Sequence, residues 1–359
     1  MMNRTVLLNP GPVNVTERVR QALLKPDLCH REAEFSDLLG SIRSKLVRIF
    51  GIGLEFDAVL VTGSGTAALE MAVCSCLSEG KTMLVICNGV YGDRIATMVK
   101  AHGLNPHSLT YDWGQPPEVS DVEQALKQHP DIEVVALVHH ETTTGLINPV
   151  QDIGQVVRKY DRRFLVDSIS GLASDPLDFN RVGVDFCVGT ANKCLQGLPG
   201  VSFVLVRKSE LARLEALPER SHYFNLYSNH HAQENGETLF TPAVQVYYAL
   251  DAALDELLEE SLEKRIQRYS QAAQLLRKGF QEMKLEFLIA ESHRSNTLTA
   301  LKLPEGVSYK SLHDQLKKKG FVIYAGQKKL SESIFRIANM GDITTEEFQN
   351  LLKALKDCI

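Results

Sequence analysis

The sequence predicts an α/β protein in which a mostly parallel sheet is covered by helices and is followed by a smaller α+β unit. Three observations favour this fold class. Short runs of Val, Ile and Leu without polar alternation are typical of strands covered on both faces. Between about residues 15 and 240 these runs alternate with helix-forming stretches, as expected of βαβ crossovers. After Thr241-Pro242 the pattern changes to a long helical region followed by short strands and helices.

Apolar runs of the first region end at polar or glycine residues, and we expect each to be a buried strand. The stretch TAALEMAVCSCL (66–77) is rich in Ala, Leu and Met, which predicts a helix directly after the first of these strands. In chain order the strand segments are FDAVLVTGSG (56–65), TMLVICNGVYGDR (82–94), VVALVHHETTTG (134–145), RRFLVDSISG (162–171) and VDFCVGTANK (184–193).

The second region begins with residues 243–283, where apolar positions at spacings of three and four predict a long helical stretch. A helix at SLHDQLKKKG (311–320), strands at FVIYAG (321–326) and IFRIAN (334–339), and a final helix at 344–356 follow. No Gly/Ser/Pro-rich linker separates the two regions. We therefore predict an N-terminal arm at 1–20, a large domain at 21–245 and a small C-terminal domain at 246–359.

Composition limits the function classes. Hydrophobic residues make up 44% and charged residues 23% of the chain, as in ordinary globular proteins, so disordered and fibrous classes are excluded. The 39 Lys and Arg against 44 Asp and Glu give a net charge of −5, which argues against a general nucleic-acid partner.

Several features predict the cytoplasm as the location. No apolar run approaches the roughly 18 residues that would span a bilayer, so we expect no membrane partner. The start, MMNRTVLLNPGP, has too short an apolar stretch for a signal peptide. Seven cysteines without paired spacing are typical of free thiols in a reducing compartment, and the sequence predicts no metal site.

Candidate functional residues follow the predicted strands, because ligands of open α/β sheets bind beyond the carboxyl ends of the strands. These positions offer a glycine turn with hydroxyls, an aromatic ring, a carboxylate and a lysine. They are Ser64-Gly65-Thr66, Asn88-Gly89-Val90-Tyr91, Glu141-Thr142-Thr143-Thr144, Asp167-Ser168 and Asn192-Lys193.

Three of these groups have the chemistry that pyridoxal 5'-phosphate needs. A helix N-terminus with the hydroxyls of Ser64 and Thr66 is an anion site, although a plain strand–helix turn has the same pattern. Lys193 can form a Schiff base with an aldehyde, or be a surface lysine at a strand end. Asp167 can hold the proton of a pyridinium ring, or cap a turn. The combination favours the cofactor, with Tyr91 as a stacking face or, alternatively, a packed core tyrosine.

The chain resembles the fold-type I, class-V PLP-dependent aminotransferases of the alanine–glyoxylate/serine–pyruvate branch, and within it most of all the 2-aminoethylphosphonate–pyruvate transaminases. The resemblance runs nearly end to end. HHETTTGLINP and ANKCLQGLPG are its most specific motifs. The others are LNPGPV (8–13), PDLCHREAEF (26–35), GSGTAALE (63–70), NGVYGDR (88–94), VDSISG (166–171), FTP (240–242), GFVIYAG (320–326) and FRIANMGD (335–342).

The resemblance implies a role for each site residue. Lys193 and Asp167 would be catalytic, with Lys193 as the Schiff-base lysine and Asp167 on the pyridine nitrogen. Tyr91 would stack on the ring, and Thr142 would contact the ring hydroxyl. Substrate would meet Arg336, Pro10, Gly11 and Arg31. The phosphate would be held by Ser64, Gly65, Thr66 and, from a neighbouring subunit, Thr241, so the active sites of a homodimer would be shared.

Two arginines have alternative interpretations. Arg31, in the loop at 26–35, would add a second positive charge for a dianionic phosphonate, or pair with Glu34 as a structural residue. We expect Arg94, three residues after Tyr91, to be structural rather than substrate-binding. Arg336 has a structural alternative too, an ion pair on the sheet.

The activity implied is ping-pong transamination of 2-aminoethylphosphonate and pyruvate to phosphonoacetaldehyde and L-alanine, or the reverse. Alanine–glyoxylate or serine–pyruvate transamination is the nearest alternative. A cysteine desulfurase-like or lyase activity would need a reactive cysteine, for which Cys194 is the nearest candidate. A non-catalytic PLP-binding protein is a further alternative, which the presence of Asp167 and Arg336 disfavours.

Overall fold

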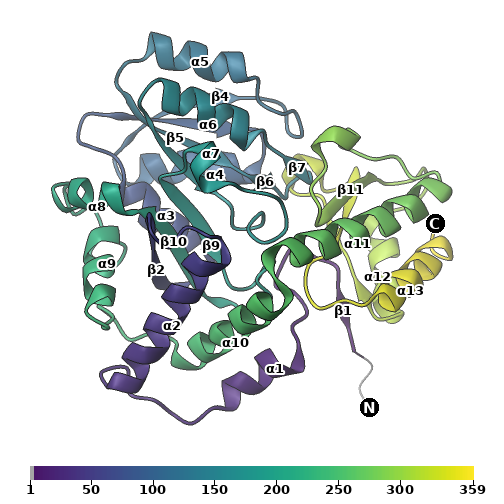
Figure 1. The fold of residues 1–359 in the computed structure, drawn as a ribbon. Helices are drawn as coiled ribbons and strands as arrows, with labels where there is room; N and C mark the ends of the chain where they lie inside the picture. Colours follow the sequence, from purple (N-terminus) through teal and green to yellow (C-terminus); the bar gives the residue numbers. More distant parts are fainter. Residues whose placement is uncertain (1–3) are drawn as a thin grey trace.

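A seven-stranded sheet forms the centre of the larger part of the molecule in the computed structural model, which describes residues 4–359 (Figure 1). Its strands are β2 (Phe56–Gly63), β3 (Thr82–Cys87), β4 (Asn105–Thr110), β5 (Ile132–Val138), β8 (Arg163–Asp167), β9 (Phe186–Thr190) and β10 (Gly200–Arg207). They lie in the order β2-β10-β9-β8-β5-β3-β4. Six run in one direction and β10 runs opposite to both neighbours, which confirms the predicted mostly parallel sheet.

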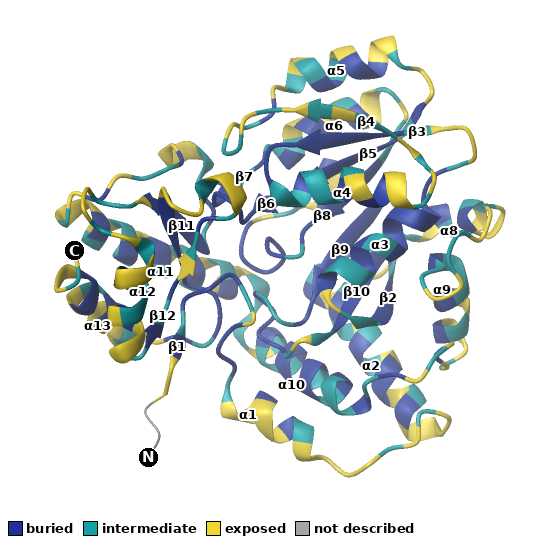
Figure 2. Cartoon of the chain, turned by 180° about the vertical axis from the view of Figure 1, so that it is seen from behind, coloured by how far each residue is buried: buried dark blue, intermediate teal, exposed yellow. Residues whose placement is uncertain are grey.

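Helices cover both faces of this sheet, and alternate residues of a strand belong to different cores. Leu84 and Ile86 of β3 pack on one side, whereas Met83 and Val85 pack on the other. The first side is covered by α2 (Ala33–Ile49), α5 (Val119–Gln128), α6 (Val150–Lys159), α7 (Phe179–Val182) and α10 (Val244–Glu260). The second is covered by α3 (Gly65–Ser75), α4 (Val90–Ala101), α8 (Lys208–Glu215) and α9 (Leu226–Glu234). The sheet strands are accordingly dark blue in Figure 2, with β4 at one edge as the partly exposed exception.

The small domain has its own antiparallel sheet and core. Its strands are β11 (Leu298–Lys302), β14 (Ile334–Ala338) and β13 (Tyr324–Ala325), in that order. Its helices are α11 (Leu262–Glu282), α12 (Tyr309–Lys318) and α13 (Thr345–Lys356), beside the short turns η2 (Glu291–His293) and η3 (Lys328–Leu330). Together with the large sheet, this confirms the predicted fold class.

Residues 321–326 do not form the single strand that we expected. Phe321–Val322 is β12, which pairs in parallel with β1 (Val6–Leu7) near the N-terminus, whereas β13 pairs with β14. The chain changes partner at Ile323, whose side chain is buried in the small-domain core. Val6 and Leu8 join this same core, so the start of the chain packs on the small domain.

The long helical region at 243–283 is two helices. The helical conformation is interrupted at Ser261, which has a φ of 73° and is the N-cap residue of α11. Before the break, α10 packs against α2 and beside α1 (Glu17–Gln21) and η1 (Ala22–Leu24); after it, α11 packs on α13. The division into an N-terminal arm (1–20), a large domain (21–245) and a small domain (246–359) stays a prediction. Residues 1–3 of the arm lie outside the part of the chain that the structure describes.

None of the helices found between residues 4 and 359 is both long enough and apolar enough to cross a membrane.

Candidate active site

The predicted site residues that follow β2, β3, β5, β8 and β9 lie at the carboxyl ends of these strands. At the end of β2, Ser64 is the N-cap residue of α3, and Gly65 is the first residue of that helix. Ser64 is exposed, and within residues 4–359 its side chain makes no capping hydrogen bond. The hydroxyl and the first N–H groups of α3 are therefore available to an anion. This is what the predicted phosphate site formed by Ser64, Gly65 and Thr66, the phosphate cradle, requires.

Lys193 lies in the turn after β9, against the loop that contains Pro10 and Gly11. A Cβ atom on Gly11, whose φ is 96°, would lie 2.6 Å from Cδ and 2.9 Å from Nζ of Lys193. The glycine therefore makes room for the lysine side chain. Burial lowers the pKa of Lys193 to about 8, and the nearby positive charges of Arg336 and Arg94 act in the same direction.

Asp167 ends β8 and is buried. The backbone N–H of Ile169 donates to its Oδ1 at 3.0 Å. Burial raises the pKa of Asp167 to about 6, while the hydrogen bond from Ile169 and the charges of Arg94 and Lys193 oppose that rise. The structure thus brings Asp167 and Lys193 close enough for each charge to affect the pKa of the other.

Tyr91 lies in the first turn of α4 beside the cradle. The guanidinium carbon of Arg94 is 4.8 Å from the centroid of the Tyr91 ring, a cation–π distance. Nη1 of Arg94 donates to the hydroxyl of Thr66 at 3.2 Å. Arg94, which we expected to be structural, therefore contacts two residues predicted to hold the cofactor.

Arg336 is buried in β14 and is anchored by backbone carbonyls. Its Nε donates to the carbonyl of Ala325 at 2.8 Å, and its Nη1 donates to the carbonyl of Thr142 at 2.7 Å. No carboxylate of residues 4–359 forms an ion pair with it, so the alternative of an ion pair on the sheet is wrong for this part of the chain. A buried guanidinium without a counterion is suited to an anionic substrate.

No hydrogen bond within residues 4–359 joins two of the predicted residues, Arg31 and Thr241, to the other site residues. Both are exposed. Nη1 of Arg31 donates to the carbonyl of Thr238 at 3.5 Å, and the alternative pair with Glu34 is not formed in the described chain. Their predicted roles at the site stay predictions.

Glu141 is a site residue to which sequence reasoning assigned no role. It was named only as one of the residues that follow the predicted strands, yet it is completely buried and receives four hydrogen bonds from residues around the site. The available signal was a carboxylate three residues after the predicted strand that ends at Val138, in a largely apolar stretch where an acidic residue is unusual unless it is paired.

Cys194 does not meet the requirement of a desulfurase-like activity. Its side chain is fully buried, and burial raises the pKa of its thiol to about 12. A reactive cysteine needs an exposed thiol with a lowered pKa.

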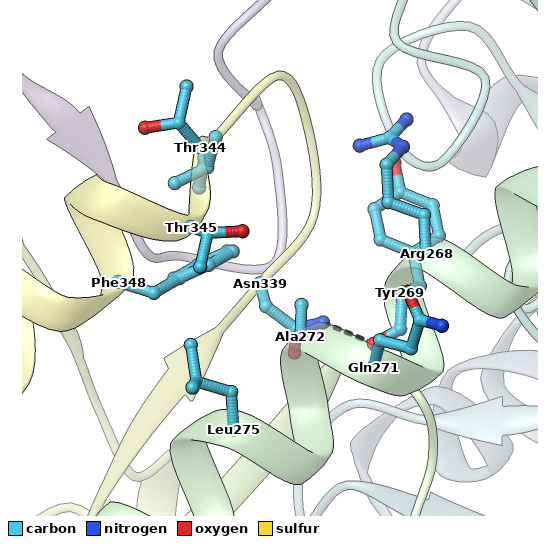
Figure 3. A pocket seen from close by; sticks show the side chains of 10 residues that line it. Arg268, Tyr269, Gln271, Ala272, Leu275, Asn339, Thr344, Thr345 and Phe348 are labelled. Atoms are coloured by element: carbon cyan, nitrogen blue, oxygen red, sulfur yellow. Dashed lines mark hydrogen bonds between the residues drawn. The ribbon is translucent and has the colours of Figure 1, made fainter.

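A cavity of about 340 Å³ lies in the small domain between α11 and the start of α13 (Figure 3). Arg268 lines it, but Nε and Nη2 of this residue already donate to the carboxylate of Glu260. None of the predicted site residues lines this cavity, which therefore does not compete with the strand-end site.

The residues of the strand-end site fit pyridoxal phosphate. The amine of Lys193 has no hydrogen-bond partner within the described residues, and its desolvation favours the neutral, nucleophilic form. A buried carboxylate and an open helix N-terminus complete the donor set that the aldehyde, ring nitrogen and phosphate need. The fold and this site define the class, a pyridoxal-phosphate-dependent transferase.

Comparison with known proteins identifies the family. The family model described as Aminotransferase class-V matches residues 19–344. A 2-aminoethylphosphonate–pyruvate transaminase of Syntrophobacter fumaroxidans is 36% identical over 363 residues, covering 99% of this chain and 97% of the relative. An aminotransferase of Methanocaldococcus jannaschii, described as uncharacterized, is 36% identical over 341 residues, covering 94% and 88%. The structure of alanine–glyoxylate aminotransferase from Nostoc sp. superimposes with a TM-score of 0.94 at 25% identity, covering 100% of this chain and 96% of that chain.

The chain belongs to the class-V aminotransferase family. It is a pyridoxal-phosphate-dependent transaminase with the fold-type I architecture, as the resemblance implied.

Proposed function

We propose that this enzyme transfers the amino group of 2-aminoethylphosphonate to pyruvate, giving phosphonoacetaldehyde and L-alanine, or catalyses the reverse reaction. The observation that carries the proposal is the buried guanidinium of Arg336, which forms no ion pair within residues 4–359 and whose charge helps to lower the pKa of Lys193. A planar guanidinium binds a carboxylate or a phosphonate through two hydrogen bonds. The name of the S. fumaroxidans relative supports the phosphonate as the donor.

Each site residue then has a task. When bound, pyridoxal phosphate supplies an aldehyde that exchanges with the amino group and a ring that withdraws electrons from the neighbouring carbon. The Nζ of Lys193, whose pKa burial lowers to about 8 in the cofactor-free chain, would accept the proton from the carbon that carries the amine and would return it to the neighbouring carbon of the bound cofactor. The carboxylate of Asp167 would hold the proton on the ring nitrogen. Because one site serves both substrates in turn, the kinetics should be ping-pong.

We also propose a cytoplasmic homodimer in which Thr241 completes the phosphate cradle of the partner copy. Thr241 is exposed, and beside it the rings of Tyr223 and Phe240 stack with centroids 4.4 Å apart. Tyr223 and Leu239 each leave 38% of their surface exposed, and a partner copy that receives Thr241 would cover them. All seven cysteines are free thiols, in agreement with a reducing compartment.

A hybrid dimer tests the shared site. Lys193→Ala and Thr241→Ala subunits carrying different tags are co-expressed and the mixed dimer is purified. If the sites are shared, one site of the hybrid combines the native Lys193 of one subunit with the native Thr241 of the other. The hybrid should then have about half of the wild-type activity, whereas each variant homodimer should be inactive. A hybrid no more active than its two parents would refute the shared cradle.

The donor is tested in a half-reaction. The purified yellow enzyme is mixed, without a keto acid, with 2-aminoethylphosphonate, L-alanine or L-serine, and conversion of the bound aldehyde to the amine form is followed by absorbance. We expect conversion by 2-aminoethylphosphonate and by L-alanine, the two amines of the proposed reaction. Conversion by the α-amino acids alone would instead favour alanine–glyoxylate or serine–pyruvate transamination, which the structural similarity to the Nostoc enzyme supports.

A further inference from the structure

Glu141 is a buried carboxylate to which the proposed function gives no task. It ends β6 (His140–Glu141), which forms a small antiparallel pair with β7 (Leu146–Ile147). Its side chain accepts four hydrogen bonds. The backbone N–H groups of Tyr91 and Gly92 donate to Oε2 at 3.1 and 3.3 Å. The backbone N–H and the hydroxyl of Thr143 donate to Oε1 at 3.1 and 2.6 Å.

These bonds replace a cap that α4 lacks. The N-cap residue of α4 is Gly89, which has no side chain with which to accept the first N–H groups of the helix. Glu141 accepts those of Tyr91 and Gly92, and the Thr143 hydroxyl accepts that of Val90 at 3.0 Å. A Cβ atom at Gly89 would lie 2.2 Å from Cδ of Glu141, so the glycine is what allows the carboxylate to approach.

The same bonds connect the two segments that carry predicted cofactor contacts. Tyr91, the proposed stacking residue, is on the α4 side, and Thr142, the proposed contact of the ring hydroxyl, precedes Thr143. The carbonyl of Thr142 in turn accepts from Arg336, the proposed substrate residue. The Gln327 side chain of the small domain reaches this network too, because its Oε1 lies 3.4 Å from the Thr143 hydroxyl.

We propose that Glu141 is a positioning residue of the active site. Its carboxylate accepts hydrogen bonds both from the first turn of α4 and from Thr143. In this way it fixes the spacing between Tyr91 and Thr142, the two residues between which the cofactor ring would bind. The inference rests on the roles proposed for Tyr91 and Thr142 but not on the identity of the amine. Burial raises the pKa of Glu141 to about 7, and the hydrogen bonds from Thr143, Gly92 and Tyr91 oppose that rise and favour the ionised form.

The main test is Glu141→Gln. The glutamine keeps the volume but turns an NH2 group toward one pair of N–H donors, so one of the two segments is released. We expect the affinity of the apoenzyme for pyridoxal phosphate, measured by titration of its absorbance, to fall about tenfold or more. We also expect the circular dichroism band of the bound cofactor to weaken, because the ring is no longer held in one orientation.

Glu133→Gln is the matched control. Glu133 is in β5, at the opposite end of the sheet from the site, and accepts a backbone N–H and a hydroxyl from Ser78 at 2.6 and 2.8 Å. This is the same kind of donor pair that Thr143 gives to Glu141. We expect Glu133→Gln to lower the melting temperature but to leave cofactor affinity within about twofold of wild type.

Thr143→Val keeps the experiment decisive if Glu141→Gln does not fold. It removes the hydroxyl that joins Glu141 to Val90 and that lies 3.4 Å from Oε1 of Gln327, and we expect a loss of about threefold or more in cofactor affinity. The proposal is overturned if Glu141→Gln, or Thr143→Val in its place, lowers the melting temperature but binds the cofactor as tightly as wild type. It is also overturned if Glu133→Gln lowers the affinity for the cofactor as much as Glu141→Gln does. If 2-aminoethylphosphonate proves not to be the donor, the expected results of these cofactor titrations stay the same, so the two proposals can fail separately.

Discussion

Replacing Lys193 with methionine should stabilise the cofactor-free protein at neutral pH, although it abolishes transamination. Burial lowers the pKa of Lys193 from 10.5 to about 8, so at pH 7 the folded chain contains a charged and poorly solvated amine. At about 1.4 kcal/mol for each pK unit, this corresponds to a cost of roughly 3 kcal/mol relative to the unfolded chain. Methionine keeps the apolar stem without the charge, and we expect a gain of about 1–3 kcal/mol in unfolding free energy.

The gain should disappear in a defined pH range. Between pH 8 and 10.5 the unfolded chain holds a proton on Lys193 that the folded chain does not, so wild-type stability rises relative to the variant. Urea unfolding of both apoproteins at pH 7, 9 and 10 measures the gap. Lys318→Met, at an exposed position of α12, is the control and should change stability by less than about 0.5 kcal/mol. A destabilised Lys193→Met protein at pH 7, or a gap that is the same at pH 7, 9 and 10, would refute the reasoning.

Three further substitutions test the geometry of the site. Gly11→Ala places a Cβ atom 2.6 Å from Cδ of Lys193 at a φ of 96°, and thermal unfolding should show a loss of about 1–3 kcal/mol; wild-type stability with normal cofactor binding would contradict the packing. Arg336→Lys loses the planar pair of donors, so steady-state kinetics should give a KM for the keto acid raised about ten- to a hundredfold, and an unchanged KM would remove Arg336 from the substrate site. Asp167→Asn should stabilise the apoprotein above pH 6 by up to about 3 kcal/mol, because burial raises the pKa of Asp167 from 3.8 to about 6. This gain should fade as the pH falls toward 4. Urea unfolding at pH 7 and pH 4 measures it, and an equal gain at both pH values would contradict the reasoning.

The large sheet was predictable because each of the predicted strands is an apolar run that ends in a polar or glycine signal. Lys193 and Asp167 follow such runs, and the carboxyl ends of parallel strands meet at one edge, so their proximity follows from sequence position alone. β4 and β10 escaped this reasoning. β4 is an edge strand with Pro106 and mixed exposure, and β10 runs against the others without a ligand-bearing end.

Pairings between distant parts of the chain were beyond the local pattern. β1 lies beside β12 across more than three hundred residues, and the split of 321–326 between two sheets depends on that pairing. Glu141 illustrates the same limit within the site. A carboxylate in a motif indicates a functional residue, but only the fold shows that it accepts a hydrogen bond from Tyr91, fifty positions earlier, in the first turn of α4.

The arrangement of charge explains why both cofactor and proposed substrates are anions. The chain as a whole has a net charge of −5, yet the site gathers three cations, Lys193, Arg94 and Arg336, against two buried carboxylates, Asp167 and Glu141. Burial raises the pKa of each of these carboxyls, so a fall in pH removes negative charge first and leaves the site more positive. Neither Arg94 nor Arg336 forms an ion pair with a carboxylate of residues 4–359, so a phosphate and an acidic substrate would supply the missing counterions. Cofactor loading should therefore strengthen the site electrostatically as well as chemically, because it replaces repulsion among these cations with pairing.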